Sequence, residues 1–421
     1  MSAPPSDHRL WPGKARPDGH GDHDWHPTTF HCLDVAACAS ALLAANPAWL
    51  GRLARGCDVS TSSLRTLFVQ LAALHDIGKL SEKFCTDIAL SVPVPTANNN
   101  RSSRRHWQIS FYLLHDELDE TVERLTGVRR RGARRALCAA VAGHHGTPAT
   151  LRPPGNEDLV GLPACKAFID ELGTLVAASE PIELDARTAR RLSWSLAGLT
   201  VAADWIGSRQ QWFRYTSPTT PTNEYWRLAK ERAACAVKEA GLSGSPPSGS
   251  SDCATLFGIT SPRPMQKAAA EEPLTDEPTL AILEDTTGSG KTEAALLLAH
   301  RMMRRRLGEG VYVALPTTAT ADAMYERLGG VYRRLFATEA EPSIALAHGR
   351  RRYSETFREA VAFAGKHASR NDPSDSVGAR KSLESDERPV QMSCAEWVAD
   401  DRRKTFLGEI GVGTIDQAFL S

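Results

Sequence analysis

The chain has 421 residues, of which 42% are hydrophobic, so it is long enough for two or three domains with substantial cores. The charges of fifty basic and fifty acidic residues cancel, so the chain as a whole has no strong electrostatic attraction for nucleic acid. Any nucleic-acid binding must therefore use local basic patches. Nine scattered cysteines, no signal peptide and no apolar run of membrane-spanning length predict free thiols in a reducing cytoplasm and exclude a membrane partner.

Helical periodicity dominates the region from 27 to about 240. The stretch before it is rich in histidine and interleaved with Gly, Asp and Pro, and we interpret it as a flexible loop. Its histidines are His8, His20, His23 and His26. Because few strand signals interrupt the helical pattern, the sequence predicts an all-α domain over 1–240. The segments expected to form helices are 28–45, 62–75, 105–118, 131–144, 187–206 and 223–240.

The run Leu-His-Asp-Ile-Gly-Lys places His75 and Asp76 at the C-terminal end of a helical stretch. Adjacent side chains rarely share one packing face, so this pair is suited to hold a metal ion. The doublet His144-His145 follows an apolar helix in the same way. Imidazole and carboxylate donors without thiolate spacing favour Mn, Fe, Co, Ni or Zn in a hydrolytic site over a structural zinc. Further donors on or at the ends of helices are His31, His106 and Asp204.

This pattern resembles the HD superfamily of metal-dependent phosphohydrolases. More narrowly, it resembles the HD nuclease domain of the CRISPR-associated helicase–nuclease of type I systems. The narrower resemblance rests on several short stretches of this sequence. They are Leu-Trp-Pro-Gly-Lys at 10–14, His31 with Val35, the run from His75 to Lys79, Arg105-His106 with Ser110, the histidine doublet, and Asp204-Trp205.

The resemblance implies two divalent transition-metal ions, Mn, Fe, Co or Ni, in an all-helical domain. Asp76 would bridge them, and such a pair can clamp the attacking and leaving oxygens of a phosphodiester and activate a water. The implied reaction is DNA cleavage. Trp107 stands where the family usually has an acidic residue. The implied ligands of the first metal are His31, His75, Asp76 and Asp204, those of the second are Asp76, His106, His144 and His145, and the implied catalytic residues are His75, Asp76 and Lys79.

Arginine clusters at 129–135, 304–306 and 350–352 are candidate local patches for DNA. A solvated helix face or loop is the alternative interpretation of each cluster.

The composition changes at 241–255, where Gly, Ser and Pro predict a flexible linker. Beyond it the pattern alternates between strand, glycine turn and helix. Such alternation is typical of a parallel sheet with crossover helices, so the sequence predicts an α/β domain over 256–421. The expected elements are a strand at 280–283, a helix at 291–306 and a strand at 311–315.

The turn before the expected helix reads Glu-Asp-Thr-Thr-Gly-Ser-Gly-Lys-Thr over 284–292. Its glycines let backbone N–H groups converge on phosphate oxygens at a helix N-terminus, while Lys291 can neutralise the outer phosphates and Thr292 can reach Mg²⁺. The sequence therefore predicts that this domain binds ATP with Mg. Asp285 replaces the first glycine of the general pattern, as in the loop of superfamily-2 helicases. The residues expected at the nucleotide are Gln266, Thr287, Gly288, Ser289, Gly290, Lys291 and Thr292.

Neighbouring motifs extend this resemblance to superfamily-2 helicases. Pro-Arg-Pro-Met-Gln at 262–266 resembles the glutamine motif that reads adenine. The stretches 314–320 and 412–418 resemble motifs that contact the DNA strand, the second one in a form typical of the CRISPR helicase. The resemblance implies that 256–421 is the first half of a RecA-like helicase domain. The residues that it implies at DNA are Thr317, Thr318, Thr414, Asp416 and Gln417.

The sequence ends at Ser421, where the family continues with an acidic Mg²⁺-binding box and a second RecA-like domain. The acidic stretch 386–389 lacks a preceding apolar strand and contains Pro389, so we interpret it as a loop. We therefore expect an N-terminal portion of a longer protein that binds ATP but hydrolyses it poorly.

The predicted function is metal-dependent cleavage of single-stranded DNA in CRISPR antiviral defence, coupled in the full-length protein to an ATP-dependent helicase. The expected partners are single-stranded DNA and a crRNA-guided multisubunit surveillance complex bound to target DNA. One alternative is an HD phosphohydrolase of nucleotides or other small phosphorylated molecules, which would not need the motifs near Thr317 and Thr414. The other is a non-catalytic ligand-binding regulatory module.

Overall fold

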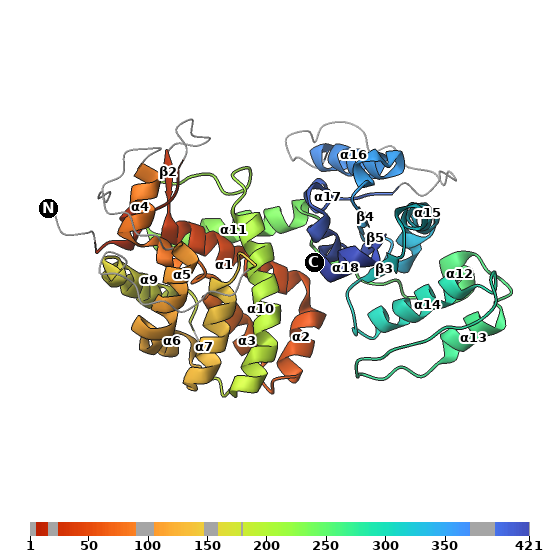
Figure 1. The fold of residues 1–421 in the computed structure, drawn as a ribbon, viewed down its shortest axis with the longest axis horizontal. Coiled ribbons are helices and arrows are strands. Elements are labelled where there is room, and N and C mark those ends of the chain that lie inside the picture. The colour runs from red at the N-terminus through yellow and green to blue at the C-terminus, as the bar shows by residue number, and fades with distance from the viewer. Residues whose placement is uncertain are drawn as a thin grey trace. The chain divides into compact units, whose positions relative to one another are not determined.

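The computed structural model describes residues 6–15, 24–89, 105–146, 159–177, 180–370 and 392–420. The chain divides into two compact units, Met1–Val237 and Lys238–Ser421. The first unit is helical, and the second contains a small sheet with helices around it (Figure 1). The acidic stretch 386–389 lies outside the described residues.

The first unit is all-α apart from one short hairpin, as the sequence predicts. Helix α3 ends at Ala72, three residues before the expected end, and a turn carries the chain through His75 and Asp76. Its helices are α1 (Thr28–Ala45), α2 (Pro47–Arg55), α3 (Thr61–Ala72), α4 (Glu82–Ala89), α5 (His106–Tyr112), α6 (Asp119–Thr126), α7 (Arg131–Ala142), α9 (Leu162–Leu175), α10 (Ala186–Gly207) and α11 (Thr222–Glu239). Short helical turns lie at His8–Leu10, Ile77–Lys79 and, in π-helical form, Leu113–Glu117.

Helix α1 is the central core helix of this unit and packs against α3 and α10 (Figure 1). By length and composition it could cross a membrane, because its window of 18 residues has a mean hydropathy of 1.4. However, 78% of the window is buried inside the protein, as expected for the core helix of a globular unit.

The N-terminal stretch forms part of the core, so its interpretation as a flexible loop was wrong at His8 and His26. Strands β1 (Pro12–Ala15) and β2 (Trp25–Pro27) form an antiparallel hairpin. His8 and His26 are both buried, because each ring nitrogen finds a polar partner inside the unit. His20 and His23 lie outside the described residues.

The turn after α3 is held against α5 by a close backbone approach at Gly78. A Cβ atom there would collide with the backbone of His106 and Ser110, and Gly78 N donates a hydrogen bond of 2.8 Å to Ser110 Oγ. This contact brings the His75-Asp76 pair beside the first residue of α5, His106.

The second unit contains a three-stranded parallel sheet with β5 between β3 and β4 (Figure 1). Strand β3 coincides with the expected strand 311–315. The strands are β3 (Val311–Leu315), β4 (Ile344–Ala347) and β5 (Ile410–Thr414). The helices are α12 (Cys253–Phe257), α13 (Pro264–Glu271), α14 (Lys291–Arg304), α15 (Thr318–Gly329), α16 (Glu355–Arg370), α17 (Glu396–Asp400) and α18 (Ile415–Leu420). Helical turns lie at Tyr332–Leu335, Arg351–Tyr353 and Arg402–Leu407.

The strand expected at 280–283 is absent, so that prediction was wrong. The segment has no regular structure, and the side chains of Leu280 and Ile282 are 87% and 81% exposed. An isolated apolar run gains no ladder hydrogen bonds, and among the described residues no strand pairs with it.

The Gly, Ser and Pro stretch after α11 lies against the second unit. Ser245 donates a hydrogen bond to Glu409, Ser248 contacts His300 at 3.1 Å, and Pro247 forms a backbone bridge with Phe336. The two units divide within α11, a few residues before this stretch. All nine cysteines have free thiols.

Candidate metal centre

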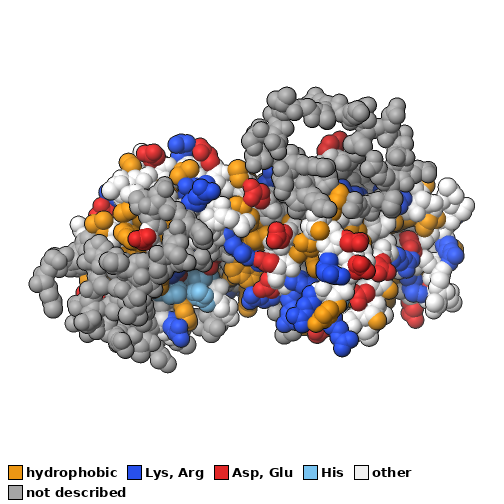
Figure 2. Space-filling model, turned by 90° about the horizontal axis from the view of Figure 1, so that it is seen from above, with side chains coloured by type: hydrophobic (Ala, Val, Ile, Leu, Met, Phe, Trp, Pro, Cys, Tyr) orange, Lys and Arg blue, Asp and Glu red, His pale blue; other side chains and the backbone are white. Residues whose placement is uncertain are grey.

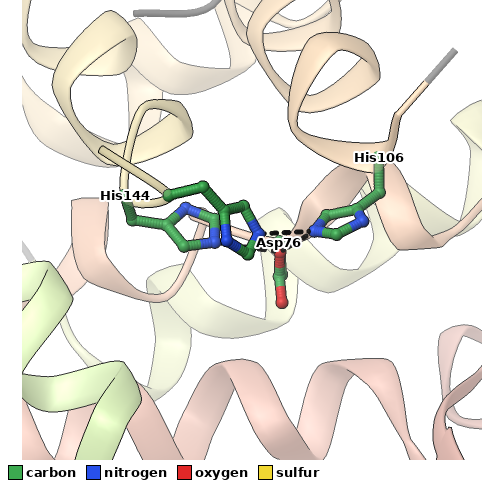
Figure 3. Close-up of side chains that lie close together, drawn as sticks. Asp76, His106 and His144 are labelled. Atoms are coloured by element: carbon green, nitrogen blue, oxygen red, sulfur yellow. Dashed lines mark hydrogen bonds and ion pairs between the residues drawn. The ribbon is translucent and has the colours of Figure 1, made fainter. Parts of the chain in front are cut away.

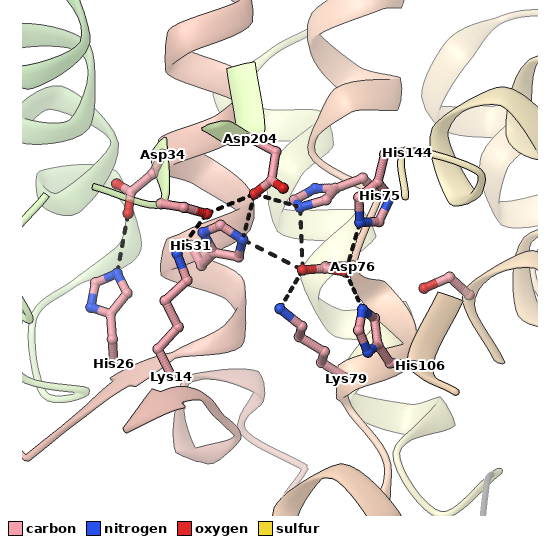
Figure 4. Close-up of polar contacts among 12 residues, drawn as sticks. Lys14, His26, His31, Asp34, His75, Asp76, Lys79, His106, His144 and Asp204 are labelled. Atoms are coloured by element: carbon pink, nitrogen blue, oxygen red, sulfur yellow. Dashed lines mark hydrogen bonds and ion pairs between the residues drawn. The ribbon is translucent and has the colours of Figure 1, made fainter. Parts of the chain in front are cut away.

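Several segments of the helical unit converge on one polar cluster (Figure 4). It contains all seven residues that the sequence proposes as metal ligands. Helix α1 contributes His31 and α10 contributes Asp204, whereas the remaining residues come from helix ends and turns. These are His75 and Asp76 after α3, His106 at the start of α5, and His144 and His145 after α7.

One half of the cluster surrounds Oδ2 of Asp76. Nε2 of His31 and Nε2 of His75 lie 3.4 and 3.3 Å from this oxygen. The same two nitrogens lie 3.3 and 3.8 Å from Oδ1 of Asp204. Four donors from three parts of the fold therefore face one another, and Lys79 Nζ approaches Asp76 Oδ2 at 2.5 Å.

The other half surrounds Oδ1 of Asp76 (Figure 3). Nε2 of His106 lies 3.3 Å and Nε2 of His144 lies 3.5 Å from this oxygen. Nε2 of His145 is 3.0 Å from Nε2 of His106. The two carboxylate oxygens of Asp76 thus face two different sets of imidazoles, as required of a carboxylate that bridges two ions.

Backbone contacts orient two of the imidazoles. Nδ1 of His75 donates to the carbonyl of Ala72 at 2.9 Å, and Nδ1 of His144 donates to the carbonyl of Val141 at 2.8 Å. A proton on Nδ1 leaves the lone pair on Nε2, which is the tautomer that binds a metal. Both Nε2 atoms and Asp76 Oδ1 are buried without a hydrogen-bond partner among the described residues. Orphaned acceptors of this kind fit a divalent transition metal.

Both carboxylates of the cluster are held in the charged form. Burial alone would raise the pKa of Asp76, but the charge of Lys79 and the neighbouring histidines hold that pKa well below its usual range. Burial opposes ionisation of Asp204 as well, while its hydrogen bond with His31 and the charge of His75 lower its pKa. The anionic forms are the ones that bind metal.

Acid is expected to destabilise the metal-free protein as the pH falls from about 6.5 to about 4. Burial lowers the pKa of His144 from 6.5 to about 4, and burial also lowers the pKa of His31. In this window the unfolded chain takes up protons that the folded chain does not, so the free energy of unfolding falls with the pH. Asp76 and Asp204 act in the same direction at lower pH.

Thermal melting of the chelator-treated protein across this pH range measures the effect. His144→Gln removes one of the titrating groups and should make the dependence less steep. A melting temperature that is constant or rises as the pH falls through the window would contradict the expectation.

The two halves of the centre differ in burial. His145 is exposed and His106 is partly exposed, whereas His31, His75 and Asp76 are buried. Figure 2 shows histidine side chains reaching the surface of the helical unit as one group. Among the described residues, the second half of the centre is therefore its more exposed part.

Lys14 and Ser208 belong to the cluster but are absent from the sequence-based set. Lys14 Nζ lies 3.0 Å from Ser208 Oγ, and Ser208 donates a hydrogen bond of 2.9 Å to Asp204 Oδ1. Burial lowers the pKa of Lys14 to about 8. Lys14 lies in β1, 190 positions before Asp204 in the sequence, so periodicity gives no signal for this contact. The i, i+4 spacing of Asp204 and Ser208 on one helix could have identified the second residue.

The glycine turn of the second unit contains two glycines in the left-handed backbone region and leads directly into α14. Gly288 and Gly290 have φ angles of 81° and 90°, and Lys291 begins α14. A Cβ atom at Gly290 would collide with the amide of Gln266, which is buried beside the loop. Lys291 Nζ donates to the carbonyls of Asp285 and Thr286 at 2.6 and 2.7 Å. The structure thus brings Gln266 and the loop together, with Thr287 and Ser289 on the same turn and Thr292 in the first turn of α14.

The residues expected at DNA in this unit follow two neighbouring strands. Thr317 and Thr318 lie just after β3, and Thr414 is the last residue of β5, paired with Leu315. Asp416 and Gln417 lie in the first turn of α18, and Gln417 Nε2 donates a hydrogen bond of 3.0 Å to Asp416 Oδ2. Parallel strands end at one edge of the sheet, so both groups lie at the same edge. Their contact with DNA stays a prediction.

The helical unit and its histidine and aspartate cluster define an HD-type metal-dependent hydrolase. Residues 11–213 match the family model described as "Cas3, HD domain". The match covers most of the N-terminal unit, and the chain as a whole is similar to CRISPR-associated Cas3 helicase–nucleases.

Individual relatives resemble both units. The CRISPR-associated endonuclease/helicase Cas3 of Escherichia coli (strain K12) is 26% identical over an alignment 438 positions long, which covers 95% of this chain and 46% of that protein. The crystal structure of T. fusca Cas3-ADP has a TM-score of 0.77 at 22% identity, covering 99% of this chain and 44% of that one. A chain of a CRISPR RNA-guided surveillance complex in a pre-nicking state has a TM-score of 0.54 at 23% identity, covering 77% of this chain and 38% of that one. The chain spans less than half of the length of its curated relatives.

Proposed function

We propose that this chain carries a metal-dependent deoxyribonuclease that cleaves single-stranded DNA in CRISPR antiviral defence. The observation that carries the proposal is the position of Asp76, whose two oxygens face separate imidazole sets at 3.3 to 3.5 Å. The endonuclease/helicase names of the curated relatives support the choice of DNA as substrate.

Two divalent transition-metal ions, of the series Mn, Fe, Co and Ni, would be held by the two halves of the cluster. When bound, such ions lower the pKa of a water and stabilise the attacking and leaving oxygens of a phosphodiester. His31, His75, Asp76 and Asp204 would hold the first ion. Asp76, His106, His144 and His145 would hold the second.

The protein's own side chains would fix the geometry of the ligands and the charge around them. Asp76 fixes the separation of the two halves, and the Nδ1 contacts of His75 and His144 prevent their rings from turning. Lys79 places a positive charge against Asp76 Oδ2 and limits the repulsion between that carboxylate and an incoming phosphate. We therefore assign His75, Asp76 and Lys79 as the catalytic core.

The second unit is proposed to bind ATP with Mg through Lys291, Thr292 and the backbone of the glycine turn, with Gln266 at the adenine. The positive φ angles at Gly288 and Gly290 support this assignment. Thr317, Thr318, Thr414, Asp416 and Gln417 are proposed to contact the DNA strand. Poor ATP hydrolysis by residues 1–421 alone, and coupling to an ATP-dependent helicase in the full-length protein, stay predictions.

The proposed partners are single-stranded DNA and a crRNA-guided surveillance complex on target DNA. The likeness to a chain described in a CRISPR RNA-guided surveillance complex supports the second partner. The cytoplasmic location expected from the free thiols also stays a prediction.

A substrate comparison tests the proposal. The purified chain, loaded in turn with Mn, Fe, Co or Ni, is given a single-stranded oligonucleotide and, separately, a set of nucleoside phosphates. We expect cleavage of the oligonucleotide and at least about 100-fold slower turnover of the nucleotides, because the more exposed half of the centre leaves room for a chain. Faster nucleotide hydrolysis would support the phosphohydrolase alternative. Metal binding without any turnover would support the regulatory module.

A further inference from the structure

The outer face of α10 carries a stripe of exposed residues that is unusual for this unit. Trp194 is 82% exposed. Among the described residues of the helical unit, no other large hydrophobic side chain is exposed. Arg187, Arg190 and Arg191 are exposed on the same helix. A Cβ atom at Gly198 would meet nothing within 4 Å. We name these five residues the α10 stripe.

Helical geometry places the stripe on one face of α10, the helix that also carries the proposed ligand Asp204. Residues 187, 190, 191, 194 and 198 follow the i, i+3, i+4, i+7 and i+11 spacing of a single helix face. Eighteen residues make five turns, so Arg190 and Ser208 share one direction around the helix axis. Ser208 is bonded to the proposed ligand Asp204. The opposite face of α10 packs on α1 and α7 (Figure 1).

The arginines of the stripe are available to an anion. Among the described residues neither Arg187 nor Arg190 forms an ion pair, and Arg191 donates only to the carbonyl of Gly56, at 3.1 Å. The acidic neighbour Asp185 is engaged by the backbone N–H groups of Arg187 and Thr188 as the helix cap.

The arginine cluster at 129–135 differs in this respect. Arg131, Arg134 and Arg135 are paired with Asp116, Asp119 or Glu123. Acidic side chains of the protein largely neutralise the charges of these three arginines. The α10 stripe is therefore the stronger candidate in the helical unit for binding the phosphates of a DNA strand.

We propose that the α10 stripe binds the single-stranded DNA that extends beyond the cut site of the metal centre. This inference rests on the proposed nuclease function and adds the path of the substrate. The arginines would pair with phosphates and the exposed indole would stack on a base, while Gly198 leaves room for the strand between the indole and Asp204. A positive track interleaved with an aromatic side chain is the chemistry of sequence-independent single-strand binding.

Distance along the helix makes the proposal quantitative. Trp194 lies ten residues before Asp204, or about 15 Å at 1.5 Å per residue. A stacked strand advances about 3.4 Å per nucleotide, so the indole meets a base about four nucleotides from the cut. Substrates of two nucleotides cannot reach the stripe, whereas strands of about twenty nucleotides pass it.

The test uses Trp194→Ala, Trp194→Phe and the double variant Arg187→Ala/Arg190→Ala in the full chain. For a labelled strand of about twenty nucleotides, we expect Trp194→Ala to weaken binding by about 5- to 100-fold and Trp194→Phe to restore most of it. The double variant should reduce the slope of log Kd against log salt by about 0.7 for each phosphate that the arginines no longer neutralise. Arg124→Ala on α6, 63% exposed, is the matched control.

Cleavage of a dinucleotide, measured in the same variants, separates this inference from the nuclease function. We expect the loss to be confined to the long strand. Equal binding of the long strand by wild type and variants, with DNA cleavage intact, overturns the stripe alone and leaves it as a surface for a protein partner. Loss of dinucleotide and long-strand cleavage in equal proportion also overturns it. A wild-type chain that neither binds nor cleaves DNA overturns both proposals.

Discussion

Asp76→Asn is expected to lower metal-loaded DNA cleavage by about 1000-fold or more and to reduce the bound metal. Asparagine keeps the size of the side chain but replaces one oxygen by an amide nitrogen, which cannot bind a cation. The bridge between the two halves is then lost, and with it several kcal/mol of stabilisation of the transition state. Metal analysis and initial rates on a single-stranded oligonucleotide measure the two effects.

Two comparisons keep this prediction specific. Asp170→Asn replaces a carboxylate whose side chain is 68% exposed on α9, far from the cluster in sequence, and should leave activity unchanged. Circular dichroism should report the same helix content in both variants. Lys79 loses its close partner in Asp76→Asn, so a modest fall in melting temperature is expected. Retention of full activity with unchanged metal content would remove Asp76 from the centre.

Residues next to one another or at helix ends made the metal centre predictable from the sequence. His75-Asp76 and His144-His145 follow two amphipathic helices, and adjacent side chains rarely share one packing face. The structure adds what spacing cannot give, namely which oxygen of Asp76 faces which imidazole. That assignment depends on the close approach at Gly78, where α5 meets the turn after α3.

Predictions from local patterns were wrong where distant contacts decide the structure. His26 is buried because Asp34 and Tyr225 complete its hydrogen bonds, and Tyr225 is 199 positions away in the sequence. The local pattern of Gly, Asp and Pro around it predicts only a loop. The segment 280–283 shows the converse, because its apolar pattern fits a strand but no described strand pairs with it. Periodicity reports how one face of a segment is composed, not whether a partner is present.

Lys291→Ala is expected to weaken ATP binding by about 10- to 150-fold while leaving metal-dependent cleavage of single-stranded DNA unchanged. The ammonium group supplies a charge-assisted contact to phosphate, whose loss costs about 1.5 to 3 kcal/mol. Every proposed metal ligand belongs to the first unit, so the cleavage chemistry does not use this charge. Titration with a fluorescent ATP analogue and oligonucleotide cleavage are measured on the same preparation, with Lys267→Ala, an exposed lysine of α13, as the control. In the structure Lys291 Nζ donates to the carbonyls of Asp285 and Thr286, and a bound phosphate would have to replace these contacts.

Unchanged ATP affinity in Lys291→Ala would mean that the backbone N–H groups of the turn suffice for binding. An equal loss of both activities would instead show that the two units cannot act independently, and the nuclease would then depend on an intact nucleotide site.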